Sequence, residues 1–107
     1  MVHDSQLRKG VLDLAVMLVL QRGESYGYEL NRALADAGFE DLGDATVYGT
    51  LRRLEQSNWL QSRLVPSSDG PARKYYALTA AGRERLREGM TQWNELVSVM
   101  QALEDSP

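Results

Sequence analysis

Arginine, glutamine, tyrosine and threonine side chains between residues 46 and 74 offer chemistry for binding nucleic acid. Arginine can pair with the O6 and N7 atoms of guanine, glutamine can pair with the N6 and N7 atoms of adenine, and tyrosine and threonine commonly bond phosphate. Gly49 belongs with them, because a glycine keeps a helix surface low and lets the backbone approach the floor of a groove. We expect DNA contacts from Thr46, Tyr48, Gly49, Arg52, Arg53, Gln56, Ser67, Ser68, Arg73 and Lys74.

Side chains suited to catalysis are scarce in this chain. It has no cysteine and a single histidine, His3, which we expect to lie in a loose N-terminal end rather than to act as a ligand. No glycine-rich phosphate loop and no paired-carboxylate pattern points to a catalytic pocket. The missing cysteines also exclude a disulfide framework and a thiolate metal site. We therefore expect no enzymatic activity, no cofactor and no metal site.

The charge of the chain is distributed unevenly. Over 107 residues the formal net charge is −3, which taken as an average argues against a nucleic-acid partner. Residues 1–45 carry four basic and eight acidic residues, and residues 88–107 carry four acidic residues and no basic one. Residues 46–87 carry eight basic and three acidic residues, a net charge of +5. This basic block contains the candidate DNA-binding residues, and neutralisation of phosphate supplies most non-specific DNA affinity.

Hydrophobic periodicity predicts three helices, a β-hairpin and a long final helix. The expected helices cover residues 6–20, 26–37, 44–57 and 80–103, the expected strands cover residues 59–65 and 74–78, and the polar segment 66–71 is the loop between the strands. Ser25 and Thr79 are expected to cap the second and last helices, and Asn58 to end the third in the left-handed conformation.

This order of elements is that of a mainly α fold of the α+β type, the winged helix-turn-helix, in which the third helix enters the major groove of DNA. We accordingly divide the chain into a winged helix-turn-helix DNA-binding domain, residues 1–79, and a C-terminal dimerisation helix with a short acidic tail, residues 80–107.

Apolar residues at helical spacing indicate which faces of the helices are buried. The first helix is apolar around most of its circumference, with a main stripe of Leu7, Val11, Leu14, Ala15 and Leu18, and the third has a core face of Val47, Leu51 and Leu54. The last helix carries a heptad-like stripe of Leu86, Met90, Trp93, Val97, Met100 and Leu103. This stripe is longer than a small domain can cover, so we expect a homodimer in which the first helix of one subunit packs on the last helix of the other.

The longest apolar run, residues 11–20, is too short to cross a membrane. Ten residues of helix span only about 15 Å, against roughly 30 Å of hydrocarbon. No small-residue cleavage pattern follows the run. We expect neither a secretory signal nor a membrane partner, and a cytoplasmic location.

Four fragments occur together and in order: YGYEL from Tyr26, ATVY from Ala45, LRRLE from Leu51 and GPARKYYALTAAG from Gly70. Over residues 7–103 the chain thereby resembles the PadR-type transcriptional regulators of bacteria. The resemblance implies a homodimeric winged-helix repressor whose C-terminal helix packs across the dimer, in the short form that has one such helix. Members often have proline where this chain has Gly49, and glycine where it has Asn58.

A ligand site is suggested by Trp93, which lies one turn after Gly89. A flat indole beside missing side-chain volume could host a planar aromatic guest. The segment 91–94 resembles the multidrug-sensing members of the short PadR group, in which paired tryptophans sandwich flat, often cationic, drugs across the dimer. That resemblance implies a ligand site of Leu7, Gly10, Asp13, Leu14, Gly89, Trp93 and Val97. The alternatives are a Trp93 that only packs in the dimer interface and an Asp13 that only faces solvent or accepts hydrogen bonds from N–H groups.

Together these features favour a dimeric, sequence-specific DNA-binding transcriptional regulator, a repressor that a small planar aromatic ligand releases from its operator. Two alternatives stay open. The acidic composition of the first 45 residues favours a winged helix that serves as a protein–protein adaptor. A PadR-type repressor with no multidrug pocket and a different inducer is the other.

Overall fold

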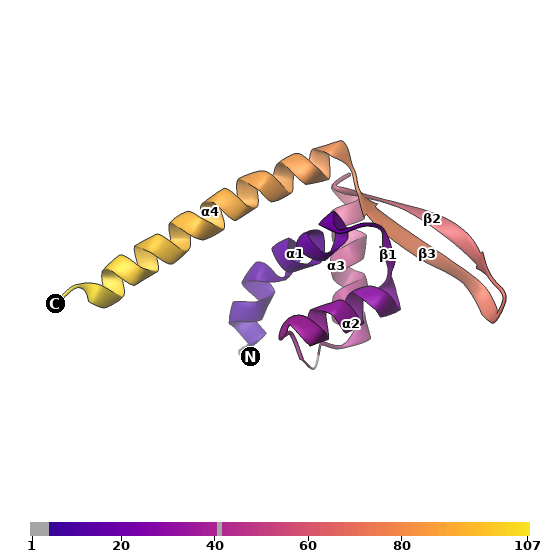
Figure 1. Ribbon diagram of the computed structural model, residues 1–107, viewed down its shortest axis with the longest axis horizontal. Helices are drawn as coiled ribbons and strands as arrows, with labels where there is room; N and C mark the ends of the chain where they lie inside the picture. Colours follow the sequence, from indigo (N-terminus) through magenta and orange to yellow (C-terminus); the bar gives the residue numbers. More distant parts are fainter. Residues whose placement is uncertain (1–4, 41) are drawn as a thin grey trace.

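The computed structural model describes residues 5–40 and 42–107, so His3 lies outside the described residues. The described helices are α1 (Ser5–Gln21), α2 (Gly27–Ala37), α3 (Asp44–Gln56) and α4 (Ala80–Asp105), and the strands are β1 (Ser25–Tyr26), β2 (Leu60–Ser67) and β3 (Gly70–Leu78) (Figure 1). Three helices are followed by a hairpin and a long helix, which confirms the predicted winged helix-turn-helix.

The hydrophobic core forms where α1, α2 and α3 meet the hairpin and the start of α4. The predicted core face of α3 is confirmed, but the predicted stripe of α1 is only partly correct. Leu7 is 62% exposed, and Leu14 and Leu18 are only partly buried, because α1 turns a different apolar face inward. The buried core side chains are Leu12, Val16, Met17, Leu20, Leu30, Leu34, Val47, Leu51, Leu54, Leu60, Tyr76, Leu78 and Leu86.

The start of α2 differs from the expectation of a cap at Ser25. Ser25 and Tyr26 form the short strand β1, which pairs antiparallel with Tyr76 and Tyr75 of β3. The prediction of a serine cap is therefore wrong, because pairing with β3 draws Ser25 into the sheet. Glu29 takes over part of the capping, since its carboxylate accepts a hydrogen bond from the Tyr26 N–H at 3.3 Å.

The hairpin is longer than predicted, and its sheet has the strand order β1-β3-β2. Pro66 and Ser67 belong to β2, Gly70 and Pro71 belong to β3, and only Ser68 and Asp69 form the turn. The pairing becomes irregular between Val65 and Ser67, where Pro66 has no N–H to donate to the ladder. The predicted six-residue loop is wrong because proline tolerates extended backbone at such a bulge.

A compact junction fixes the direction in which α4 leaves the domain. Asn58 has φ 63°, as predicted for the end of α3, and its carbonyl accepts a hydrogen bond from the Thr79 hydroxyl at 2.7 Å. The Thr79 hydroxyl oxygen accepts in turn from the Gly82 N–H at 2.9 Å, which confirms the predicted cap. A Cβ atom at Gly82 would lie 2.0 Å from the Trp59 carbonyl oxygen, so helix and backbone are in close contact there.

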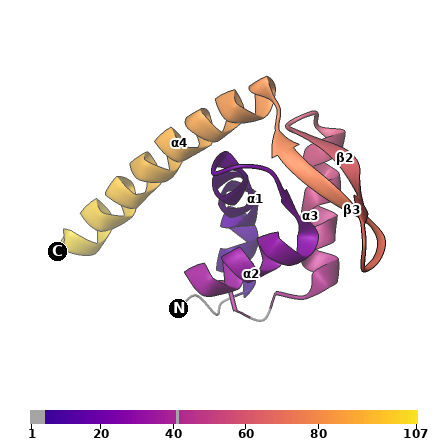
Figure 2. The same cartoon turned by 45° about the vertical axis from the view of Figure 1, so that its right-hand side comes forward.

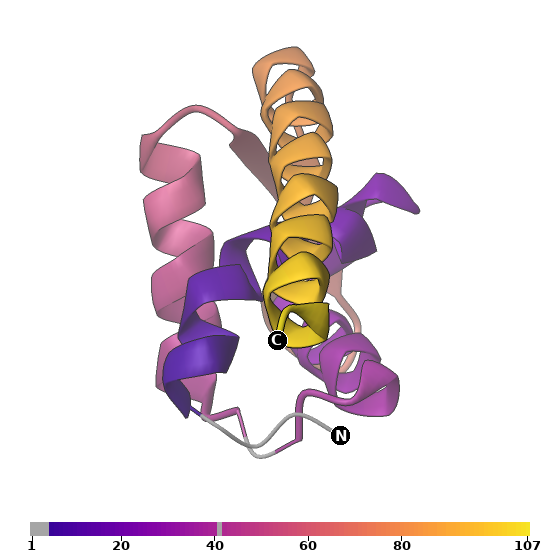
Figure 3. The same ribbon diagram turned by 90° about the vertical axis from the view of Figure 1, so that its left-hand side faces the viewer.

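Beyond this junction α4 extends far from the rest of the chain (Figure 2). The molecule measures 61 × 30 × 20 Å, and every residue of α4 from Thr91 onward is exposed. The helix crosses α1 near Gly89 and then diverges from it, leaving a groove between the two helices (Figure 3). None of the described helices is both long enough and apolar enough to cross a membrane.

Candidate nucleic-acid interface and the adjoining groove

The open face of α3 is the surface opposite its core residues. Because successive residues turn by about 100°, burial of Val47, Leu51 and Leu54 directs positions 45, 49, 52 and 56 away from the domain. Arg52 and Gln56 are exposed, and the position of a Cβ atom at Gly49 is open space. The structure thus brings these three predicted residues together and adds the exposed Ala45, whose methyl group can contact a thymine methyl.

Thr46 and Tyr48 flank the open face on opposite sides. The Tyr48 side chain packs against the first turn of α2, where a Cβ atom at Gly27 would be 2.4 Å from the Tyr48 hydroxyl oxygen. Tyr48 is nevertheless 46% exposed, so its hydroxyl can reach a phosphate beside α2. Thr46 is exposed, and its carbonyl accepts a hydrogen bond from Thr50 at 2.9 Å.

Arg53 points toward α1 instead of lying on the open face. Its Nη1 and Nη2 atoms donate to the two carboxylate oxygens of Asp13 at 3.1 and 3.0 Å. The hydrogen bonds and charge of Asp13 raise the pKa of Arg53 further above its ordinary value. Helical periodicity predicted that Arg53 faces outward with Arg52. Arg53 lies instead on the flank of α3 that adjoins α1, within reach of the Asp13 carboxylate.

Lys74 is also engaged within the domain. Its Nζ atom lies 3.4 Å from a carboxylate oxygen of Glu55 on α3, and that carboxylate also accepts a hydrogen bond from Ser62 on β2. The bond from Ser62, with further help from Lys74, lowers the pKa of Glu55. Electrostatic interaction with Tyr76, and then with Glu55, raises the pKa of Lys74. Lys74 therefore joins the hairpin to α3, and only its half-exposed side is available to DNA.

The hairpin presents the remaining predicted residues. Arg73 is exposed, and its guanidinium carbon lies 4.7 Å from the centre of the Tyr26 ring. Ser67 lies within β2, and its hydroxyl accepts a hydrogen bond from the Asp69 N–H at 3.3 Å, whereas Ser68 is exposed in the turn. Arg63, which sequence reasoning missed, forms an ion pair with Glu24. Its place on an outward side of β2 follows from strand alternation, which could have identified it.

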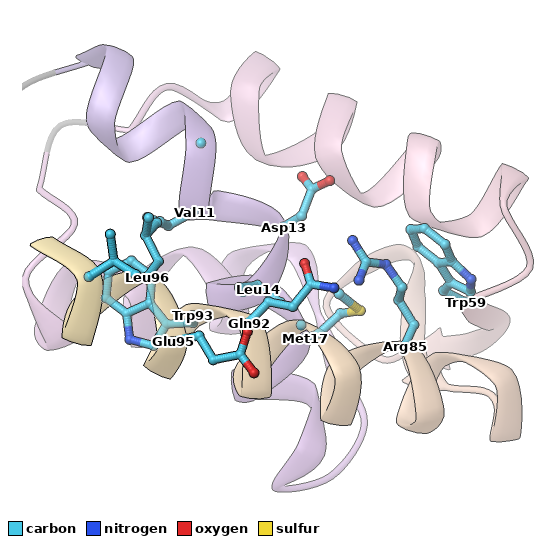
Figure 4. A pocket seen from close by; sticks show the side chains of 13 residues that line it. Val11, Asp13, Leu14, Met17, Trp59, Arg85, Gln92, Trp93, Glu95 and Leu96 are labelled. Carbon is cyan, nitrogen blue, oxygen red and sulfur yellow. The ribbon is translucent and has the colours of Figure 1, made fainter.

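A second feature adjoins this interface, a groove of about 560 Å³ between α1 and α4 (Figure 4). Of the seven residues in the predicted ligand site it brings together Gly10, Asp13, Leu14, Gly89 and Trp93, whereas Leu7 and Val97 do not line it. The predicted site lacked four polar or aromatic members of the lining, Trp59, Arg85, Gln92 and Glu95.

The two tryptophans lie at opposite ends of the groove (Figure 4). At one end the Arg85 guanidinium carbon lies 5.1 Å from the centre of a Trp59 ring. At the other end Trp93 is 36% exposed, beside Val11 and Leu96. In the groove the Trp59 indole is therefore already covered by the Arg85 guanidinium, whereas the Trp93 indole is accessible.

Gly89 does not leave the empty volume that was expected beside Trp93. A Cβ atom at Gly89 would lie 2.4 Å from Cδ2 of Leu14, so the leucine side chain occupies that space. The expectation was wrong because the small residue serves the close crossing of α4 over α1. Any planar guest would have to lie against Trp93 in the groove and not in a cavity at Gly89.

Comparison with known proteins decides the family. A model of the transcriptional regulator PadR-like family matches residues 16–88, from within α1 to within α4. The chain belongs to the PadR-like family.

Solved structures agree with this assignment over almost the whole chain. A PadR-like transcriptional regulator from Bacillus cereus is 33% identical, with a TM-score of 0.85 over 96% of this chain and 100% of that one. A Streptococcus transcriptional regulator is 37% identical, with a TM-score of 0.84 over 95% of this chain and 100% of that one. A PadR family regulator from Eggerthella lenta is 35% identical, with a TM-score of 0.87 over 95% of this chain and 88% of that one.

Membership of the PadR-like family identifies the kind of molecule that this protein binds. PadR-type proteins are transcriptional regulators that bind DNA, and they are not enzymes.

Proposed function

We propose that this PadR-type regulator is a homodimeric repressor that contacts its operator through α3 and the hairpin and is released by a planar aromatic ligand in the α1–α4 groove. The open face of α3 is the observation that carries the proposal. On it Arg52 and Gln56 are exposed, and Arg52 takes part in none of the ion pairs among the described residues. Both side chains are therefore free to contact base edges. Gly49, which precedes them in α3, has no side chain and lets the helix backbone approach the bases closely.

Substitution of Arg52 tests the DNA contact. We expect Arg52→Ala to weaken operator binding by about 1–3 kcal/mol and to relax base preference at one operator position. The operator is first obtained by selecting genomic fragments, and binding is then measured by fluorescence anisotropy at several salt concentrations. The matched control is Arg22→Ala, which removes the same charge just beyond α1 and should change affinity much less.

Either of two results would contradict this part of the proposal. One is an Arg52→Ala protein that binds the operator like the control variant. The other is a wild-type protein that enriches no fragment, which would favour the protein–protein adaptor. A steep fall of affinity with salt is also expected, because each phosphate contact contributes about 0.9 to the logarithmic slope.

The ligand part of the proposal rests on the accessible indole of Trp93 at the edge of the groove. A flat aromatic ring can stack on such an indole and displace water from the apolar side chains around it. We expect planar aromatic dyes to quench tryptophan emission and to lower operator affinity, and Trp93→Ala to abolish both effects. Trp59→Phe is the control, since Trp59 is covered by Arg85 and its loss should leave dye affinity nearly unchanged.

Unchanged dye binding in Trp93→Ala would exclude this groove as the ligand site. Dyes that bind without changing operator affinity would instead support a repressor with a different inducer. Because linkage is reciprocal, a releasing ligand must bind the free protein more tightly than the DNA-bound protein.

A further inference from the structure

Asp13 belongs to two features at once. It is one of the residues that line the α1–α4 groove (Figure 4), and its carboxylate binds Arg53 on the flank of α3, the helix proposed to contact DNA. The two residues are 40 positions apart in the sequence, and both terminal nitrogens of the guanidinium take part, at 3.0 and 3.1 Å. No other ion pair among the described residues connects α1 with α3.

The pair has a direct consequence for the charge that α3 shows to DNA. While Asp13 holds the guanidinium, the charge of Arg53 is neutralised locally and its terminal N–H groups face α1. The side chains are 61% and 37% exposed, and an exposed ion pair of this kind is weak. A DNA phosphate near α3 offers Arg53 an equivalent anionic partner, and only a side chain has to move, because the helix itself is held by its buried face.

We infer that Asp13 and DNA compete for Arg53, so that the ion pair restrains operator affinity in the free protein. This inference rests on the proposed use of the α3 face. When DNA draws Arg53 away, the Asp13 carboxylate is left without its partner at the edge of the groove. A cationic group bound at Asp13 would therefore oppose the release proposed for a planar ligand in this groove, whereas a neutral ligand of the same shape lacks this opposing contribution.

Removal of the carboxylate tests the competition. Asp13→Asn is expected to bind the selected operator fragment about two- to five-fold more tightly than wild type, the range that corresponds to loss of an exposed ion pair. The slope of log affinity against log salt should become steeper by up to about 0.9, one additional phosphate contact. In an Arg53→Gln background the same Asp13→Asn change should have no effect on either quantity.

Two comparisons separate this mechanism from a general gain of positive charge. Glu95→Gln removes a carboxylate from the same groove that has no part in the Arg53 pair, and it should leave operator affinity unchanged. The side-chain NMR signal of Arg53 in the wild-type protein should shift when the operator fragment is added and should already be shifted in free Asp13→Asn. That measurement needs no comparison of affinities between variants.

Several outcomes would overturn the inference. Weaker binding by Asp13→Asn would mean that Asp13 positions Arg53 for DNA and does not restrain it. An equal gain in the Arg53→Gln background, or from Glu95→Gln, would assign the effect to overall charge. In each of these cases the wild-type protein still binds DNA, so the proposed function stands. A wild-type protein that binds no fragment overturns both.

Discussion

Gly82 and Gly89 lie on the same helix and are both buried, yet they meet very different neighbours. A Cβ atom at Gly82 would lie 2.0 Å from the backbone oxygen of Trp59, whereas one at Gly89 would lie 2.4 Å from the end of the Leu14 side chain. A leucine side chain can rotate away, but the Trp59 backbone is held, since its carbonyl accepts a hydrogen bond from the Thr79 N–H at 3.1 Å. Gly82 therefore sets the path of α4 more strictly than Gly89 does.

Alanine substitutions test this difference. We expect Gly82→Ala to lower the free energy of unfolding by about 1–3 kcal/mol through overpacking. Gly89→Ala should cost less, because rotation of Leu14 and the better helix propensity of alanine offset the contact. Gly49→Ala, placed in open space within α3, should be neutral or stabilising by up to about 1 kcal/mol.

Urea unfolding at one fixed protein concentration measures all three variants. Equal stability of the Gly82 and Gly89 variants would show that the Trp59 contact is not rigid. Gly49→Ala has a second use, because it should lower operator affinity if the backbone approaches the groove floor there.

Some residues of the candidate site could be predicted from the sequence, and others could not. Helical periodicity is local, so the open positions Gly49, Arg52 and Gln56 could be predicted without coordinates. The partners of Arg53 and Lys74 could not, since Asp13 and Glu55 are distant in sequence and come close only in the folded chain. A basic residue on a predicted DNA face is thus an ambiguous signal until its nearest carboxylate is known.

At the scale of elements, the hairpin and α3 are joined through Glu55. Its carboxylate reaches Ser62 on β2 and Lys74 on β3 at the same time, so α3 and both hairpin strands meet at one side chain. This arrangement keeps α3 and the hairpin, the two elements proposed to contact DNA, in a fixed relation. Composition alone suggested a looser wing, because proline, serine and glycine are typical of loops. Pairing of Ser67 with Gly70 nevertheless extends the hairpin past the irregularity that follows Val65.

A pH titration of stability tests the role of Glu55. Its pKa is lowered from an ordinary value of 4.5, first by the hydrogen bond from Ser62 and then by Lys74. A lowered pKa in the folded state means that the unfolded chain binds the proton more tightly. The stabilisation from Glu55 is therefore fully present above pH 4.5 and is lost as the pH falls through its lowered folded value.

We expect Glu55→Gln to be less stable than wild type near pH 7 and to lose less stability than wild type between about pH 5 and 3. Thermal unfolding at a series of pH values measures this, with Glu88→Gln on an exposed turn of α4 as the control. Parallel pH profiles for Glu55→Gln and wild type would contradict the assigned role.

At the scale of the whole molecule, α4 is the element that its own chain covers least. Leu86 is buried, but exposure rises to between 36% and 66% for the apolar residues Trp93, Leu96, Val97, Val99, Met100 and Leu103. The predicted stripe therefore exists, and its second half has no cover among the described residues. Its heptad-like spacing suits a second helix, which supports a second copy of the chain as the partner in the proposed dimer.

A charge placed in this stripe tests the dimer. Val97→Glu is expected to shift the protein from dimer to monomer in analytical ultracentrifugation, because a buried unpaired carboxylate is costly. Its melting temperature should also fall at a given concentration. Ala102→Glu adds the same charge outside the predicted stripe and should leave the dimer intact. A dimer that survives Val97→Glu would place the interface elsewhere.

If the proposed dimer forms through the uncovered half of α4, operator binding depends on the abundance of the protein itself. Under the proposed dimer, the species that occupies an operator forms in proportion to the square of the chain concentration when most chains are single. Repression would then respond more steeply than linearly to synthesis and dilution. Through the fifteen exposed helical residues 91–105, occupancy of the operator would thus depend on the cellular concentration of the chain.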